Sequence, residues 1–92
     1  MKTVWKWQFD LMTVTATFKM PAGASIVNIE YEKFSSVEGR ISIWATIETT
    51  EAELVERTFT LYGTGHKVEE NTVYVGTVRV GQFVFHLFEE IT

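Results

Sequence analysis

Apolar and polar residues alternate with a period of two along most of this chain. From Met12 to Met20, every second residue is apolar, and threonine or lysine fills the positions between them. Such alternation is typical of a strand that buries one face. The same pattern predicts strands over residues 3–9, 12–20, 25–34, 40–49, 55–62, 73–80 and 83–88.

Turn-forming residues separate these segments. Pro21-Ala22-Gly23 ends the second predicted strand, and a polar loop from Ser35 to Gly39 ends the third. Residues 50–53 are compatible with a single capped helical turn. Short strands and turns of this spacing predict an all-β fold, a compact antiparallel β-sandwich or small barrel of about seven strands, with one domain over residues 1–92.

The clearest element is the predicted hairpin from Val73 to Phe88. Gly81-Gln82 suits a type II′ turn, in which glycine takes the positive φ of the first position. The turn also predicts which residues lie opposite each other across the hairpin. One face is made of the pairs Val80 and Phe83, Val78 and Phe85, and Gly76 and Leu87. The reverse face is made of the pairs Arg79 and Val84, Thr77 and His86, and Val75 and Phe88. The first face is apolar and belongs in the core. We expect the mixed reverse face to be covered or to bind something.

Composition narrows the classes of function. Hydrophobic residues make up 46% of the chain and aromatic residues 14%, so a core can form, and we expect Trp5 and Trp7 to anchor it. Cysteine is absent, which excludes disulfides and cysteine-ligated metals. A net charge of −4 argues against general binding to nucleic acid or anionic membranes. No apolar run reaches the roughly 20 residues of a membrane span, so we expect a cytoplasmic protein.

The most suggestive motif is the loop Tyr62-Gly63-Thr64-Gly65-His66. Its two glycines could let backbone amides surround an anion, with a hydroxyl and an imidazole beside it. The motif lacks the lysine of a phosphate-binding P-loop and is not followed by a helix. A plain turn at a strand end is the alternative.

Two further positions are candidates for binding. Trp44 lies on an otherwise polar strand face, where it could stack on a ligand or partner, or be covered by another segment. His86 could join Thr77 and Arg79 in a patch for an anion or a partner, or simply hydrogen-bond to Thr77 across the hairpin. Two histidines on different elements do not predict a metal site, and no cofactor is predicted.

The sequence favours binding over catalysis. No Ser/His/Asp or paired-carboxylate arrangement is visible, and Glu89-Glu90 and the other glutamate clusters are interpreted as solvated charge. We also expect a homo-oligomer, with Val84 and Phe88 in its interface, because a thin core gains little stability alone.

Several stretches together resemble a family of short bacteriophage and prophage proteins. They are MKTVWKW, MPAGASI, ISIWA, RTFTLYGTGHKV and YVGTVRVGQFVFHLFE, and they span nearly the whole chain. The segment from Asn28 to Val37 is longer than the resemblance leads us to expect, which favours a long hairpin there. The resemblance implies a phage-encoded protein in the host cytoplasm but brings no agreed activity.

Three functions follow as hypotheses. The first is an accessory protein that binds or inhibits a host protein through Trp44 or the reverse hairpin face. The second is an oligomeric sponge for a nucleotide-like host-defence signal, with Gly63, Thr64, Gly65, His66 and Arg79 at the phosphate and Trp44 or Tyr62 at the base. The third is a minor virion or assembly component.

Overall fold

The computed structural model describes residues 1–36, 38–48 and 52–91. Its elements are β1 (Thr3–Asp10), the 3-10 helix η1 (Leu11–Thr13), β2 (Thr15–Pro21), β3 (Ser25–Lys33), β4 (Gly39–Ile47), β5 (Leu54–Gly63), β6 (Thr72–Val80) and β7 (Phe83–Glu90). The predicted all-β class and the number of strands are confirmed. Thr49 and residues 50–51 of the predicted helical turn lie outside the described residues, and residues 52–53 are described and are not helical.

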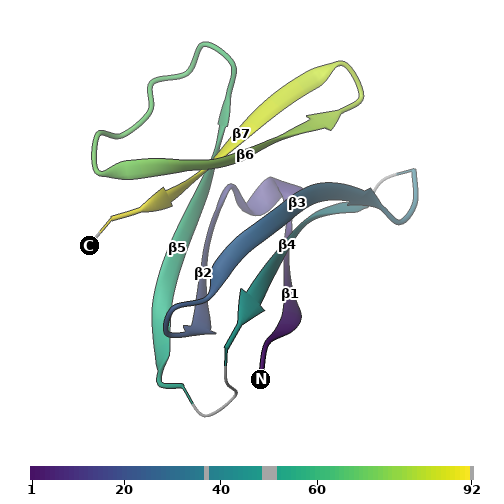
Figure 1. Ribbon diagram of the computed structural model, residues 1–92. Coiled ribbons are helices and arrows are strands. Elements are labelled where there is room, and N and C mark those ends of the chain that lie inside the picture. Colours follow the sequence, from purple (N-terminus) through teal and green to yellow (C-terminus); the bar gives the residue numbers. More distant parts are fainter. Residues whose placement is uncertain (37, 49–51, 92) are drawn as a thin grey trace.

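The strands form two antiparallel sheets that pack as an open sandwich (Figure 1). One sheet has the order β1-β4-β3, and the other has the order β2-β5-β7-β6. The η1 turn carries the chain from the edge strand of the first sheet to the edge strand of the second. At the other side of the sandwich, β3 lies beside β6 without pairing with it. The long β3–β4 hairpin expected from the sequence is present.

The core lies between the two sheets. Every second side chain of β4 from Ile41 to Ile47 lies in the core, as its sequence predicts, and the facing sheet closes the core from β5, β6 and β7. The buried apolar residues of these four strands are Ile41, Ile43, Ala45, Ile47, Phe59, Leu61, Val78 and Leu87. Side-chain alternation therefore decides which face of each central strand is buried.

The β6–β7 hairpin follows the predicted register for most of its length. Gly81 has φ +61°, as the first position of a type II′ turn requires, and Thr77 lies opposite His86. The predicted pair of Val75 and Phe88 is wrong, because a β-bulge between Tyr74 and Gly76 places Tyr74 opposite Phe88 instead. A bulge adds one residue to one strand, so the pairing beyond it shifts.

The predicted strand from Met12 to Met20 begins later than its pattern indicates. The Asp10 carboxylate accepts a hydrogen bond from the Met12 backbone N–H at 2.8 Å and caps η1. Val14 then has φ +66° and ψ −51°, and β2 starts at Thr15. Met12, expected on the buried face, is 84% exposed. A local side-chain cap therefore overrides the alternating pattern.

The two N-terminal tryptophans differ in burial. Trp7 packs against the core, but Trp5 is 38% exposed and lies against Trp7 with ring centroids 6.2 Å apart. The expectation that both anchor the core is correct only for Trp7.

The side chain of Arg57 forms a largely buried ion pair within the four-stranded sheet and also contacts the turn before β3 of the other sheet. Arg57 on β5 donates to both carboxylate oxygens of Glu89 on β7, at 2.5 and 2.7 Å, and to the carbonyl of Ala24 at 2.6 Å. Ala24 precedes β3 of the other sheet. The side chains of Arg57 and Glu89 are only 19% and 16% exposed, so the interpretation of Glu89 as solvated charge is wrong.

A second polar cluster covers the outer face of the three-stranded sheet. Ser42 is fully buried and donates to Glu32, whose carboxylate also accepts from Gln8 at 3.1 Å and lies 2.7 Å from the Lys6 ammonium. The hydrogen bonds from Lys6 and Ser42 lower the pKa of Glu32 below its ordinary value, and burial opposes them only in part. The folded state therefore favours the ionised form of the Glu32 carboxyl more than the unfolded state does.

We expect Glu89→Ala to lower the free energy of unfolding by about 2–4 kcal/mol, because it leaves the guanidinium of Arg57 largely buried without its partner. Glu90→Ala removes the neighbouring, exposed carboxylate and is the matched control. Urea denaturation monitored by tryptophan fluorescence gives both values. Equal losses in the two variants would show that the ion pair contributes nothing specific.

We expect the stability difference between the unchanged protein and Glu32→Gln to depend on pH. Since folding lowers this pKa, the contribution of the carboxylate is complete above the ordinary value of 4.5 and is lost as the pH falls through the lower value of the folded state. Denaturation at a series of pH values measures the difference. Glu30→Gln, which removes an exposed carboxylate from the same strand, is the control. A difference that stays constant on acidification would contradict the assignment.

Candidate functional site

Trp44 lies apart from the other candidate residues. It is half-buried on the outer face of the three-stranded sheet, where the Lys6 ammonium lies 5.0 Å from the centroid of its ring. Its partners across the strands are Lys6 and Asn28. Because the core separates this face from the four-stranded sheet, Trp44 and the Tyr62–His66 loop do not meet within one chain.

Most of the remaining candidates share the outer face of the four-stranded sheet. Strand register places Tyr62 and Thr77 on either side of His86, and Arg79 opposite Val84. Phe88, two residues after His86, packs edge-on against Tyr62 and Tyr74 with ring centroids 5.6 and 5.5 Å away. This is the reverse face of the hairpin, and it carries both aromatic and polar side chains.

The polar side chains of this face form a hydrogen-bonded chain around His86. The Thr77 hydroxyl lies 3.0 Å from His86 Nδ1, which confirms the hydrogen bond expected across the hairpin, and the Thr64 hydroxyl lies 2.9 Å from Nε2. Tyr74 extends the chain to Thr77 at 2.5 Å. If Nε2 carries the proton, it donates to Thr64, whose hydroxyl donates in turn to the Val84 carbonyl at 3.4 Å. Thr77 then donates to Nδ1 and accepts from Tyr74. The two sides of the imidazole are therefore held by hydroxyls.

The loop after β5 is a tight turn that places His66 at the end of the sandwich. The His66 backbone N–H donates to the Gly63 carbonyl at 3.1 Å, and Gly65 has φ +91°. The imidazole lies so close to Gly63 that a Cβ there would come within 3.1 Å of its Cε1 atom. The backbone conformation thus requires glycine at Gly65, and the small size of Gly63 leaves room for the His66 ring.

An apolar pocket lies beside this loop. It has a volume of about 250 Å³ and is formed by η1, the residue that follows it, β5, the loop and β7. Its lining is Leu11, Met12, Val14, Leu61, Gly63, His66 and Phe85, and we call it the end pocket. His66 is the only polar side chain in this lining. The sequence did not reveal the pocket, because the alternating pattern assigned Met12 and Val14 to a core face.

Exposed apolar side chains surround the end pocket. Met12 is 84% exposed, Val14 48% and Phe83 60%. Phe83 borders an adjoining hollow of about 560 Å³ that shares Gly63, His66 and Phe85 with the end pocket. We call the surface made by Met12, Val14, His66, Phe83 and Phe85 the end patch. Three separate elements contribute to it.

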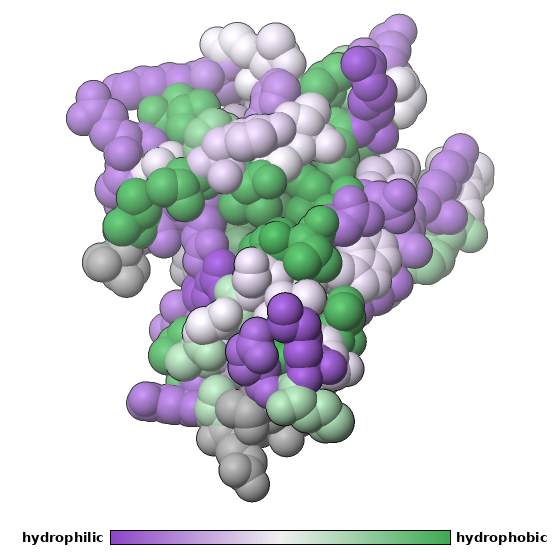
Figure 2. Space-filling model, in the orientation of Figure 1, coloured by the Kyte–Doolittle hydropathy of each residue, from purple (hydrophilic) through white to green (hydrophobic). Residues whose placement is uncertain are grey.

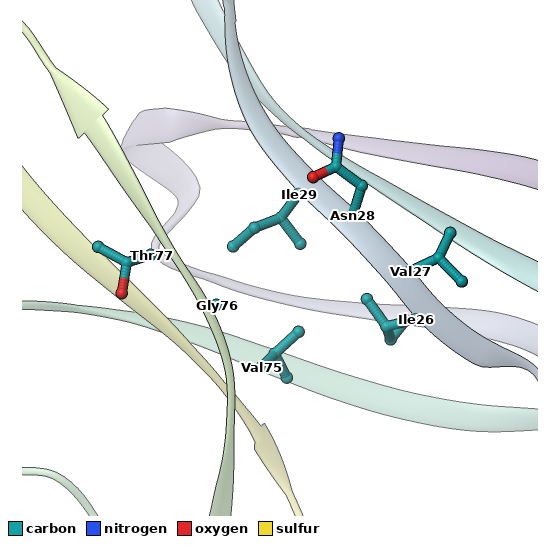
Figure 3. Close-up of a pocket in the computed structure, with 7 residues that line it drawn as sticks. All are labelled: Ile26, Val27, Asn28, Ile29, Val75, Gly76 and Thr77. Atoms are coloured by element: carbon teal, nitrogen blue, oxygen red, sulfur yellow. The ribbon is translucent and has the colours of Figure 1, made fainter.

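A different groove lies between the edge strands β3 and β6 (Figure 3). It has a volume of about 230 Å³, with Val27 and Asn28 on one wall and Val75 and Thr77 on the other. Both strands carry a β-bulge here. Ile29 points across toward Gly76, where an added Cβ would lie 2.7 Å from its Cδ1 atom. Figure 2 shows apolar side chains near the middle of the viewed face, with hydrophilic ones around them.

Residues 1–36, 38–48 and 52–91 hold no group of three or more His, Cys, Asp or Glu side chains that could bind a metal ion. In the same ranges, no helix is long and apolar enough to cross a membrane.

Comparison with known proteins identifies a family but no activity. No curated protein and no solved structure matches the chain. A family model described as "Domain of unknown function (DUF7352)" matches residues 1–92. The chain therefore belongs to the DUF7352 family over its whole length.

Proposed function

We propose that this chain is a binding module that contacts a protein partner through the end patch. The observation that carries the proposal is the grouping of three well-exposed apolar side chains, with Met12 and Val14 on the end pocket and Phe83 on the hollow that adjoins it. Small soluble proteins seldom expose large contiguous apolar surfaces unless these bind something. Aromatic residues and methionine are also enriched where proteins meet.

The chemistry of the end patch supports binding rather than catalysis. Its only titratable side chain is His66, and no nucleophile lies in the lining of the pocket. An acid–base mechanism needs a second group in hydrogen-bonding reach of the reacting atoms. The resemblance to phage proteins supports the narrower proposal that the partner is a host protein and that both act in the host cytoplasm.

We expect Phe83→Ser and Met12→Ser to weaken capture of the partner by roughly 30-fold each, as when central interface residues are truncated. Leu54→Ser is the matched control, because Leu54 is 55% exposed at the opposite end of β5. The partner is first isolated from a lysate of the source cells, and its affinity is then measured by interferometry with each variant. Undiminished affinity in both patch variants would refute the proposal.

A second candidate is a module that sequesters a small anionic ligand such as a nucleotide. It is favoured by the grouping of Thr64, Thr77, Arg79 and His86 on one sheet face, with Tyr62 beside them as a ring for stacking. A guanidinium and hydroxyl groups are suitable partners for phosphate. In a homo-oligomer that paired this face through Val84 and Phe88, the polar residues of this face from two chains would lie close together.

Calorimetric titration with mono-, di- and cyclic nucleotides tests this candidate. We expect a saturable heat of binding from at least one nucleotide. Arg79→Ala should lower the affinity for that nucleotide about tenfold, since one charge-assisted contact is lost. Arg40→Ala removes an exposed arginine from the other sheet and is the control. If no nucleotide produces heat, the candidate fails for the ligands tested.

A further inference from the structure

We propose that the end pocket takes one aromatic side chain of the partner, a tryptophan or tyrosine, whose polar edge atom hydrogen-bonds to His66. This inference rests on the proposed function and names the group that would occupy its site. Four features of the end pocket lead to it: its volume, its lining, its backbone and the surface around it.

The volume suits a ring. A closed apolar cavity of roughly 150 Å³ accommodates benzene, and the end pocket has about 250 Å³. There is room for a six-membered ring with a further ring or a hydroxyl, which is the size of an indole or a phenol. The pocket is open to the surface at exposed Met12 and His66, so the chain that carries the ring can leave it.

The lining suits a ring that has one polar atom. Leu61 is 7% exposed and, with Leu11 and Phe85, provides apolar walls. Ligand pockets of this kind usually have few polar groups, which fix the orientation of the ligand. Here the only polar side chain is His66, and within the described ranges its ring nitrogens make no hydrogen bond to the protein. An imidazole can either accept from an indole N–H or donate to a phenol oxygen.

The backbone around the pocket is held in unusual conformations. Val14 has φ +66° although it is β-branched, and its carbonyl accepts from the Leu61 N–H at 2.9 Å. Gly65, at φ +91°, directly precedes His66 in the loop, and Gly63 leaves space for the imidazole. Residues in sparsely populated backbone conformations cluster at binding sites, where the surrounding structure holds them in place. Val14, in the lining of the pocket, is thus a strained residue that the surrounding structure holds in place, whereas glycine adopts a positive φ without strain.

The surroundings favour a side chain over a free small molecule. Phe83 extends the apolar surface beyond the pocket, and a free ring in the pocket would leave Phe83 in water. A protein segment that inserts one ring covers the pocket and the rim together. Buried aromatic anchors surrounded by weaker apolar contacts are common at protein interfaces.

The test is an NMR titration of the 15N-labelled full chain with N-acetyl-tryptophanamide, with N-acetyl-leucinamide as the non-aromatic control. We expect saturable shifts confined to amides at Leu11, Val14, Leu61, His66 and Phe85, and a weaker effect from the leucine compound. His66→Ala should weaken binding about fivefold, the usual effect of one hydrogen bond. Gly63→Ala should also weaken it, because the new Cβ displaces the imidazole.

Arg40→Ala is the matched control, since it removes an exposed side chain from β4 of the other sheet and should leave the titration unchanged. Equal binding of the two compounds, shifts outside the pocket, or unchanged affinity in both His66→Ala and Gly63→Ala would overturn the inference. If the probe does not bind but Phe83→Ser still loses the partner, only this inference fails. If the probe binds and Phe83→Ser and Met12→Ser keep the partner, the proposed function fails instead.

Discussion

The guanidinium of Arg57 on β5 holds together three segments that are distant in the sequence: β5, β7 and the turn before β3. It binds Glu89 on the neighbouring strand through two hydrogen bonds and the Ala24 carbonyl at the start of the other sheet through a third. A buried pair of charges is favourable only if its remaining donors and acceptors are satisfied. Ala24 supplies that acceptor, so the ion pair also fixes how the turn before β3 meets the four-stranded sheet.

Local patterns predict most of the strands, and they fail where a side chain or an extra residue competes with them. The period of two in β4 and the glycine at position 81 are sufficient to predict the buried face of that strand and the register near the hairpin turn. The cap from Asp10 and the bulge at Val75 each shift a strand by a residue or more. The bulge has no distinctive sequence signal, because valine is common in strands. Aspartate is favoured at caps, but Asp10 alone does not show that a three-residue turn interrupts the alternation.

The candidate site was harder to predict than the fold, because it depends on which sheet each strand joins. The glycines of the loop were recognisable as a special backbone, but their role is to admit the His66 ring beside Gly63. The sequence allowed Trp44 and the loop to form one binding site, but the strands that carry them belong to different sheets. The walls contributed by Met12 and Val14 appear only once η1 has interrupted the alternating pattern.

The loop after β5 connects two surfaces of different chemistry. Thr64 points to the outer sheet face, where its hydroxyl meets His86, and His66, two residues later, lines the apolar end pocket. Gly63 lies at the junction, with no side chain to separate the imidazole from the strand end. Because the turn is closed by one backbone hydrogen bond between these residues, displacement of His66 would strain the same turn that holds Thr64 against His86. The polar chain on the sheet face and the apolar patch at its end therefore share one structural support.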